Sequence, residues 1–367
     1  MTIQFLDLAR QYENIKPEID AAIRGVIAEA AFVSGPYVKR FEEAFAAYNR
    51  VEHCVACGNG TDALEIALEA LNLEPNSEVV VPANSFIATA EAVVRVGLKV
   101  VFCDCDAYDY TISIDSLRGK ISRHTRAIIV VHLYGHACDM DAVLEIAATY
   151  HLRVIEDCAQ AHGCEFKGVP VGTIGDIGAF SFYPGKNLGA YGDAGANLTR
   201  DANIAKRMRM IGNHGRVAKY NHEFAGRNSR MDGLQAAILS AKLPHLDSWV
   251  SCRRQLARRY DEGLAGLVDL VRPIVRPWSI HAYHLYVVRT ARRDEFREFL
   301  GSHGIETGVH YPISLPKLAA FSSVSQCGDN LLANSIDSQL LSLPIGDHMT
   351  IADVDEVVSV CRAFFEQ

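Results

Sequence analysis

Apolar residues recur along the first two thirds of the chain with two alternating periods. Spacings of three and four residues, typical of helices that bury one face, occur at 38–50, 61–73, 85–96, 114–121 and 139–150. Short runs rich in valine and isoleucine, typical of buried strands, occur at 78–82, 99–104, 127–135 and 152–158. This alternation predicts an α/β fold, with a mainly parallel sheet covered by helices on both faces.

The C-terminal third has a different pattern. A long helical pattern spans 229–264, and Pro244 within it predicts a kink or a break. One strand-like run and two helical runs follow, at 282–289, 292–301 and 350–365. We therefore predict a large domain at 1–250 and a smaller C-terminal α/β domain at 251–367.

Composition and charge narrow the class of protein. The 367 residues are 49% hydrophobic and 22% charged, which is ordinary for a globular protein. A net charge of −8 disfavours broad nucleic-acid binding. Residues 1–16 lack the basic and apolar regions of a secretory signal, and the longest apolar runs are too short to span a bilayer. We expect a cytoplasmic protein that binds neither nucleic acid nor membrane.

The ten cysteines show no regular spacing, which suits reduced thiols. Two close pairs, Cys54 with Cys57 and Cys103 with Cys105, raise a redox or zinc alternative. Both pairs fall in strand-like runs, where cysteine acts as a small apolar residue. The chain also contains no His-Glu-x-x-His sequence. We predict core cysteines and no metal site.

The segment CGNGTDAL, residues 57–64, leads from a strand into a helix. Backbone N–H groups at such a turn, around Gly60, Thr61 and Asp62, favour an anion. Ala63 replaces the third glycine of the dinucleotide fingerprint, so a single phosphate is the better ligand. A simple turn, with the Thr-Asp pair capping the helix, stays an equal alternative at this point.

In VIEDCAQAHG, residues 154–163, an apolar strand ends at Asp157. Open α/β sheets bind ligands at the carboxyl ends of their strands. Asp157 there could hold a ring nitrogen of an electron-sink cofactor, and Gln160 could hydrogen-bond a ring substituent. The alternative is that Asp157 caps a following helix.

A second apolar strand, within GDIGAFSFYPGK, leads into a loop that carries Lys186. A lysine beside an apolar strand can have a lowered amine pKa and act as a Schiff-base nucleophile, although an ordinary loop lysine is the alternative. Together, Asp157, Ser181 and Lys186 supply an acid for a ring nitrogen, a hydroxyl for a phosphate and an amine for an aldehyde. That combination predicts pyridoxal 5'-phosphate (PLP).

Most of the histidines near these segments suit packing or hydrogen bonding. His310 and Tyr311 are the exception, because an aromatic pair beside Pro312 suits a substrate wall.

Six motifs, in order, resemble those of the DegT/DnrJ/EryC1/StrS aminotransferases, PLP enzymes that act on nucleotide-linked keto-sugars. They are GNGTDAL, PANSFIATAEAV, VHLYG, VIEDCAQAHG, FSFYPGKNLGAYGDAGA and NHGRVAKYNHEFAGRNSRMDGLQAAIL. The resemblance covers nearly the whole chain. It implies the aspartate-aminotransferase type of fold (PLP fold type I) and a homodimer with active sites at the subunit interface.

The resemblance also implies roles for individual residues. Lys186 would hold the cofactor as a Schiff base and shuttle protons, with pyridoxamine 5'-phosphate as the intermediate form. The implied cofactor-binding residues are Gly60, Thr61, Asp62, Phe86, Asp157, Gln160, Ser181 and, from the other subunit, Asn228. The residues expected near the substrate are Tyr183, Tyr220, His310 and Tyr311, with Tyr220 reaching the site of the partner subunit.

The implied reaction transfers the amino group of L-glutamate to a nucleotide-linked keto-sugar. The segment around Ser229 is more similar to family members that aminate C3, because C4 enzymes more often carry an aromatic residue there. We therefore favour a 3-keto sugar on UDP or dTDP, with a 4-keto sugar as the alternative. A sugar dehydratase of the same fold, whose known members replace the lysine by histidine, and a non-enzymatic regulator are further alternatives.

Overall fold

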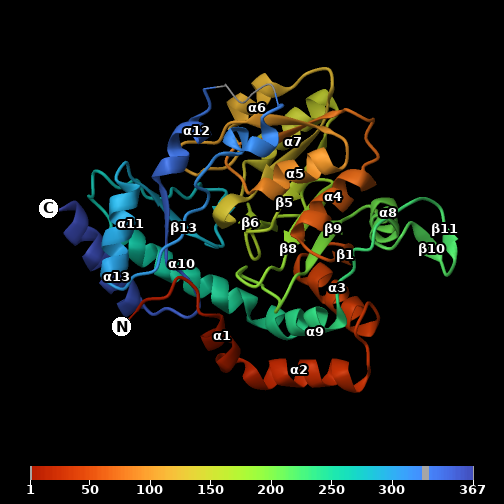
Figure 1. The fold of residues 1–367 in the computed structure, drawn as a ribbon, viewed down its shortest axis with the longest axis horizontal. Helices are drawn as coiled ribbons and strands as arrows, with labels where there is room; N and C mark the ends of the chain where they lie inside the picture. The colour runs from red at the N-terminus through yellow and green to blue at the C-terminus, as the bar shows by residue number, and fades with distance from the viewer. Residues whose placement is uncertain (1, 325–329, 367) are drawn as a thin grey trace.

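The central sheet of the computed structural model, which describes residues 2–324 and 330–366, has seven strands in the order β1-β9-β8-β5-β4-β2-β3 (Figure 1). β9 is antiparallel to both of its neighbours, and the other six strands are parallel. The strands are β1 (His53–Cys57), β2 (Glu78–Pro82), β3 (Lys99–Cys103), β4 (Thr125–Val131), β5 (Arg153–Asp157), β8 (Ile177–Ser181) and β9 (Gly195–Thr199). The predicted, mainly parallel sheet is confirmed.

Helices cover both faces of this sheet, as predicted. Side chains alternate between the faces along each strand. In β4, Ile128 and Val130 join one hydrophobic cluster and Ile129 joins the other. The first cluster includes residues of α3 (Pro36–Tyr48), α6 (Ile114–Lys120), α7 (Met140–Tyr150) and α9 (Gly233–Lys242). The second includes residues of α4 (Gly60–Ala70), α5 (Ile87–Arg95) and α8 (Ala202–Gly212).

Two predicted elements end differently in the structure. The run at 127–135 ends as a strand at Val131 and continues as a 3₁₀ turn, Leu133–Gly135. The helix predicted at 61–73 begins at Gly60, because the side chain of Asn59 accepts a hydrogen bond from the Asp62 N–H at 2.8 Å. The prediction that the Thr-Asp pair caps this helix is therefore wrong, and Asn59 is the cap.

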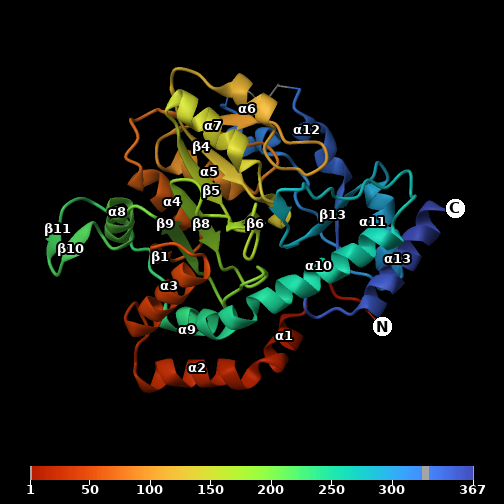
Figure 2. The same cartoon turned by 180° about the vertical axis from the view of Figure 1, so that it is seen from behind.

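The helical pattern around Pro244 is broken, as predicted. α9 ends at Lys242, a 3₁₀ turn spans Leu243–His245, and α10 continues over Leu246–Gly263. The predicted domain boundary near residue 250 falls inside α10 and stays a prediction. Figure 2 shows α10 running from the central sheet toward the C-terminal elements.

The C-terminal elements have a hydrophobic cluster of their own, to which Ile3 of the N-terminal segment also belongs. The cluster includes residues of β13 (Tyr286–Arg289), β14 (Leu340–Leu343), α11 (Arg293–Ser302), α13 (Ile351–Phe365) and the C-terminal half of α10. The remaining helices and strands are α1 (Leu8–Asn14), α2 (Lys16–Ala28), α12 (Leu332–Ile336), β6 (Glu165–Phe166), β7 (Val169–Pro170), β10 (Arg216–Ala218), β11 (Asn221–His222) and β12 (Ser279–Ile280). Among the described residues, no helix is long and apolar enough to cross a membrane.

Candidate active site

A cavity of about 520 Å³ opens at the carboxyl ends of the parallel strands. Residues that follow β1, β2, β4, β5 and β8 line it, because parallel strands end at the same edge of a sheet. The N-terminal segment and the C-terminal unit supply the other walls, through Phe5, His284 and Tyr311 among others. Segments that lie far apart in the sequence therefore meet at one site.

Lys186 lines this cavity from the loop that follows β8. Its backbone N–H donates to the Tyr183 carbonyl at 2.8 Å, which closes a turn and holds the lysine near the strand end. Burial lowers the pKa of the amine to about 8, although the carboxylate of Asp157 acts in the opposite direction. Within the described parts of the chain, no side chain bonds the Nζ atom. Lys186 thus presents to the cavity an amine with a lowered pKa and no side-chain partner among the described residues.

Asp157 is the last residue of β5 and is 5% exposed. Its carboxylate accepts hydrogen bonds from the Thr89 hydroxyl at 2.8 Å and the Ala159 N–H at 3.1 Å. Burial raises the pKa of Asp157, whereas these two donors and Lys186 lower it. Residues 158–164 form turns and no helix, so the helix-cap alternative for Asp157 is wrong.

Thr89 is a further residue of the site that the sequence pattern does not predict. It lies in α5, and its hydroxyl also pairs with the Ser85 hydroxyl at 2.7 Å. Its contact with Asp157 joins residues 68 positions apart, so no local pattern predicts it. Both hydroxyl residues lie within the motif PANSFIATAEAV, which was its only signal.

Gln160 is fixed on both ends of its amide. Its Oε1 accepts from the Tyr134 N–H at 2.7 Å, and its Nε2 donates to the Tyr311 hydroxyl at 2.9 Å. The Tyr311 ring contacts Phe86, with the ring centroids 5.4 Å apart. Phe86 is 52% exposed and borders the cavity next to Tyr311. The three predicted residues Gln160, Tyr311 and Phe86 therefore form one connected wall.

Gly60 and Thr61 line the cavity at the N-terminus of α4, where backbone N–H groups lack helical partners. A Cβ atom on Gly60 would lie 2.5 Å from the Ser181 Cβ, so only glycine lets this turn approach the end of β8. The Asp62 side chain does not line the cavity and accepts from the Ser229 hydroxyl at 2.6 Å. The Asp62 backbone N–H donates to the Asn59 side chain, so the N–H groups left for an anion at this turn are those of Gly60 and Thr61.

His310 and Tyr183 also line the cavity. His310 bonds the Ser342 hydroxyl through Nδ1 at 2.8 Å and stacks on Phe5 with ring centroids 5.8 Å apart. Burial, assisted by Lys186, lowers the pKa of His310 to about 4, so the ring is neutral near pH 7. Tyr183 is exposed at the rim.

Two predicted residues, Tyr220 and Asn228, lie away from the cavity of their own chain. Tyr220 is 85% exposed at the turn of the β10–β11 hairpin, which projects from the body of the molecule in both views (Figures 1 and 2). Asn228 pairs in a backbone bridge with Asn213. Their predicted roles, in the site of a second subunit, stay predictions.

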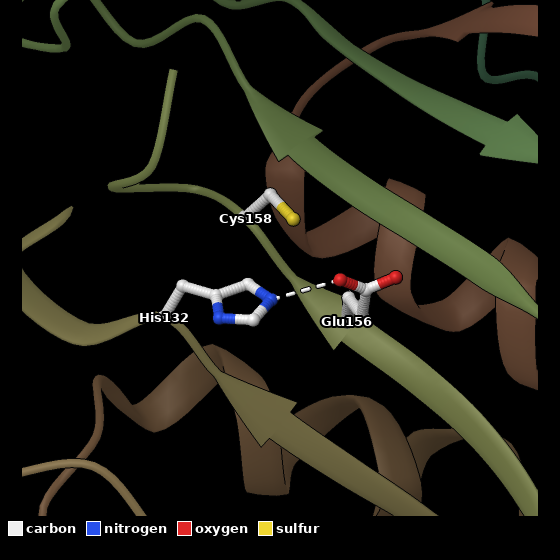
Figure 3. Close-up of side chains that lie close together, drawn as sticks. All are labelled: His132, Glu156 and Cys158. Atoms are coloured by element: carbon white, nitrogen blue, oxygen red, sulfur yellow. Dashed lines mark hydrogen bonds and ion pairs between the residues drawn. The ribbon is translucent and has the colours of Figure 1, made fainter. Parts of the chain in front are cut away.

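His132, Glu156 and Cys158 form a buried group whose ligand atoms lie within 4.8 Å of one another (Figure 3). His132 Nδ1 accepts from the Cys138 N–H at 3.1 Å, so Nε2 carries the proton and donates to Glu156 at 2.9 Å. Glu156 also accepts from three backbone N–H groups, those of Gly172, Ile174 and Gly175. With both oxygens occupied, this carboxylate acts as a structural anchor.

The nine described cysteines are free thiols, and eight of them are buried. Cys54, Cys57, Cys103 and Cys105 all belong to the two clusters that flank the sheet, as predicted. Burial raises the pKa of each of these four thiols, which keeps them protonated.

The residues of the cavity fit PLP. A buried carboxylate at Asp157 suits a protonated ring nitrogen, and the helix terminus at Gly60 with the Ser181 hydroxyl suits a phosphate. The Lys186 amine faces the same space. These three chemical groups come from β5, α4 and the loop after β8, and the fold alone brings them together.

The chain is similar over its whole length to known sugar transaminases. The chain is 42% identical over 366 residues to the dTDP-3-amino-3,4,6-trideoxy-alpha-D-glucose transaminase of Streptomyces venezuelae, covering 100% of this chain and 97% of that protein. It is 39% identical over 362 residues to a UDP-N-acetyl-3-dehydro-alpha-D-glucosamine 3-aminotransferase of Acidithiobacillus ferrooxidans, covering 98% and 97% of the two chains.

The fold is also that of solved sugar aminotransferases. The crystal structure of S. venezuelae DesV, in complex with a ketimine intermediate, superposes with a TM-score of 0.98 at 41% identity, over 100% of this chain and 99% of that chain. The predicted PLP fold type I is thereby confirmed. A sequence model of the DegT/DnrJ/EryC1/StrS aminotransferase family matches residues 13–362, and the chain belongs to that family.

Proposed function

We propose that this protein transfers the amino group of L-glutamate to the 3-keto carbon of a UDP- or dTDP-linked sugar, with PLP as cofactor. The observation that carries the proposal is the meeting of Lys186 and Asp157 at one cavity, a reactive amine and a buried carboxylate that influence each other's pKa. When bound, PLP supplies an electron sink that lets a C–H bond beside the amino nitrogen ionise.

Lys186 would anchor the cofactor and move the proton. With a pKa of about 8, its amine is partly neutral near physiological pH and can accept a proton from carbon and return it. The rings of His284 and His310 lie around the Lys186 amine. Burial lowers their pKa values, so both rings are neutral and add no positive charge beside the amine.

Asp157 would hold a positive charge on the cofactor ring. Thr89 and Ala159 fix the carboxylate from the protein side, so its orientation is set before the cofactor arrives. Gln160, which Tyr134 and Tyr311 hold in place, presents its amide to the same cavity as Asp157. The backbone at Gly60 and Thr61, with the Ser181 hydroxyl, would bind the phosphate.

The relatives support the choice of a 3-keto sugar. The S. venezuelae and A. ferrooxidans proteins are both named for amination at C3, one on a dTDP sugar and one on a UDP sugar. At Ser229 this chain has a small side chain, which bonds the Gly58 N–H at 3.0 Å and Asp62. A 4-keto sugar is the alternative that the substrate test below addresses.

We further propose a homodimer with shared active sites. The projecting β10–β11 hairpin, with Tyr220 exposed at its turn, packs little against its own chain and suits the site of a partner subunit. Mixing Lys186→Ala with Asn228→Ala subunits tests this directly. If each site uses both subunits, random exchange of subunits makes about a quarter of all sites intact. Independent sites restore none, which would contradict the shared-site proposal.

Covalent trapping tests the role of Lys186. Borohydride reduction of the loaded enzyme followed by peptide mass spectrometry should place the cofactor mass on Lys186. Lys186→Ala should lose both the label and the absorbance of the bound cofactor. Lys206→Ala, an exposed lysine in α8, is the matched control and should keep both. A label on another lysine in the wild type would refute the assignment.

A panel of UDP- and dTDP-linked 3-keto and 4-keto sugars, with glutamate as donor, tests the substrate. Turnover of the 3-keto sugars is expected, and turnover of 4-keto sugars alone would refute the assignment of position. If no sugar turns over and no lysine is labelled, the non-enzymatic regulator becomes the better description.

A further inference from the structure

Arg253 is a buried charge that has only neutral partners. It lies in α10, is 3% exposed and borders the same cavity as Lys186. Its Nη1 donates to the backbone carbonyl oxygens of Tyr283 at 3.2 Å, His284 at 3.3 Å and Ile345 at 2.8 Å. Its Nε is buried and has no hydrogen-bond partner among the described residues.

A buried guanidinium normally has a carboxylate beside it, because an uncompensated charge is costly to remove from water. Arg227, for comparison, pairs with both Glu65 and Glu69. In the described part of the chain, Arg253 has no such ion pair. Burial lowers the pKa of Arg253, and Asp347 opposes this only from a distance. Among the described residues, no carboxylate therefore lies beside the Arg253 guanidinium to balance its charge.

The cavity places this charge close to the reacting amine. Among the described residues that line it, only Lys186 and Arg253 are lysines or arginines. Arg253 bonds the backbone of His284, whose ring lies 3.3 Å from the Asn187 side chain, and Asn187 follows Lys186 directly. One layer of residues thus separates the guanidinium from the lysine loop.

An amino acid fits this arrangement. Its α-carboxylate carbon lies about 2.5 Å from its amino nitrogen, so a group that binds the carboxylate must lie beside the reacting amine. The diphosphate of a nucleotide sugar is many bonds away from the reacting ketone. A planar guanidinium also matches a carboxylate in two parallel hydrogen bonds. Resting on the proposed function, we propose that Arg253 is the binding site for a carboxylate of the amino donor.

Separate half-reactions test this. The donor half is followed by the absorbance change of loaded enzyme with glutamate, and the acceptor half by adding keto-sugar to enzyme already carrying the amine form of the cofactor. Arg253→Met removes the charge and keeps a long side chain. Arg254→Met is the matched control, since Arg254 also binds only carbonyl groups, of His281 and Gly163, and does not line the cavity.

Arg253→Met should raise the half-saturating glutamate concentration about 10- to 100-fold. The acceptor half-reaction should stay within about twofold of wild type, and Arg254→Met should change neither. An unchanged glutamate dependence in Arg253→Met, or an equal loss in both halves, would overturn the proposal. Wild-type enzyme that aminates no keto-sugar would refute the proposed function instead.

Calorimetry with inert acids gives a measurement independent of turnover. Glutarate and butyrate are titrated into the loaded wild-type, Arg253→Lys and Arg253→Met proteins, with circular dichroism to verify folding. The proposal is supported if glutarate binds the wild type, binds Arg253→Lys more weakly and binds Arg253→Met more weakly still. If butyrate, which has one carboxylate, binds the wild type as tightly as glutarate does, Arg253 contacts only one carboxylate end of the donor. Glutarate binding that is equal in all three proteins, or absent from wild type, overturns it.

Discussion

Lys186 lies half-buried in the loop after β8, and Lys242 lies buried against that loop. Burial lowers the pKa of both amines to about 8. Their surroundings differ. Lys242, at the end of α9, donates to the Gln11 side chain at 2.9 Å and to the Gly189 carbonyl at 2.8 Å. Its Nζ also lies 4.3 Å from the centroid of the Tyr191 ring. Lys186 faces a cavity, and the described residues give its amine no hydrogen-bond partner.

The comparison shows that a lowered pKa does not by itself identify a reactive lysine. The Lys242 amine is occupied by two acceptors and an aromatic face, so it is available only for structure. Gly189 follows Lys186 by three positions, and thus Lys242 supports the loop that presents the reactive amine. In the proposed function, the free amine of Lys186 carries out the chemistry and the occupied amine of Lys242 supports the loop that carries Lys186.

The largest difference is expected in turnover. Lys186→Ala should lower kcat by about 10³-fold or more, because it removes the group that moves the proton, while the midpoint of thermal unfolding of cofactor-free protein stays nearly unchanged. Steady-state kinetics and calorimetry measure the two quantities. Near-normal turnover would show that the free amine is not the reactive one.

The second expected effect lies in stability. Lys242→Met leaves the acceptors at Gln11 and Gly189 buried without a donor, which should lower the free energy of unfolding by roughly 3 kcal/mol. At a temperature where the variant is folded, kcat should fall less than tenfold. Urea titration gives the free energy. Lys206→Met, on the exposed surface of α8, is the control and should be neutral. A Lys242→Met variant that is as stable as the wild type but inactive would show that Lys242 has the catalytic role and not the supporting one.

The sequence predicted a role for Lys186 but none for Lys242. Asp157 ends one apolar strand and Lys186 follows another, so their places at the sheet edge could be predicted from the pattern alone. Lys242 and Arg253 occupy buried positions of helices, and neither was predicted to have a role. Arg253 does continue the apolar spacing of Leu246 and Val250 in α10, which was a usable signal. The partners themselves were not predictable, since Lys242 and Gln11 are 231 positions apart.

The third prediction concerns pH. The amine of Lys186 must be neutral to capture the cofactor, so the capture rate of cofactor-free protein should rise with pH through about 8. Because the Asp157 charge raises the pKa of Lys186, Asp157→Asn should move this midpoint to lower pH. Lys242→Met should leave it in place. Stopped-flow absorbance over pH 6 to 10 (a range of roughly two units on either side of the expected midpoint) measures it. A midpoint that moves upward in Asp157→Asn contradicts the assigned coupling.

The smallest effect is expected at Tyr191, whose ring lies against the Lys242 amine and whose buried hydroxyl has no hydrogen-bond partner among the described residues. Tyr191→Phe keeps the ring and removes a hydroxyl that is unsatisfied, so the free energy of unfolding should stay equal or rise slightly. Tyr191→Leu removes the aromatic face and should cost about 1 kcal/mol. The same Tyr191→Leu change in a Lys242→Met background should then cost less, because the cation is gone. Equal costs in both backgrounds would show that packing of the ring, and no contact with the ammonium, holds this side of the loop.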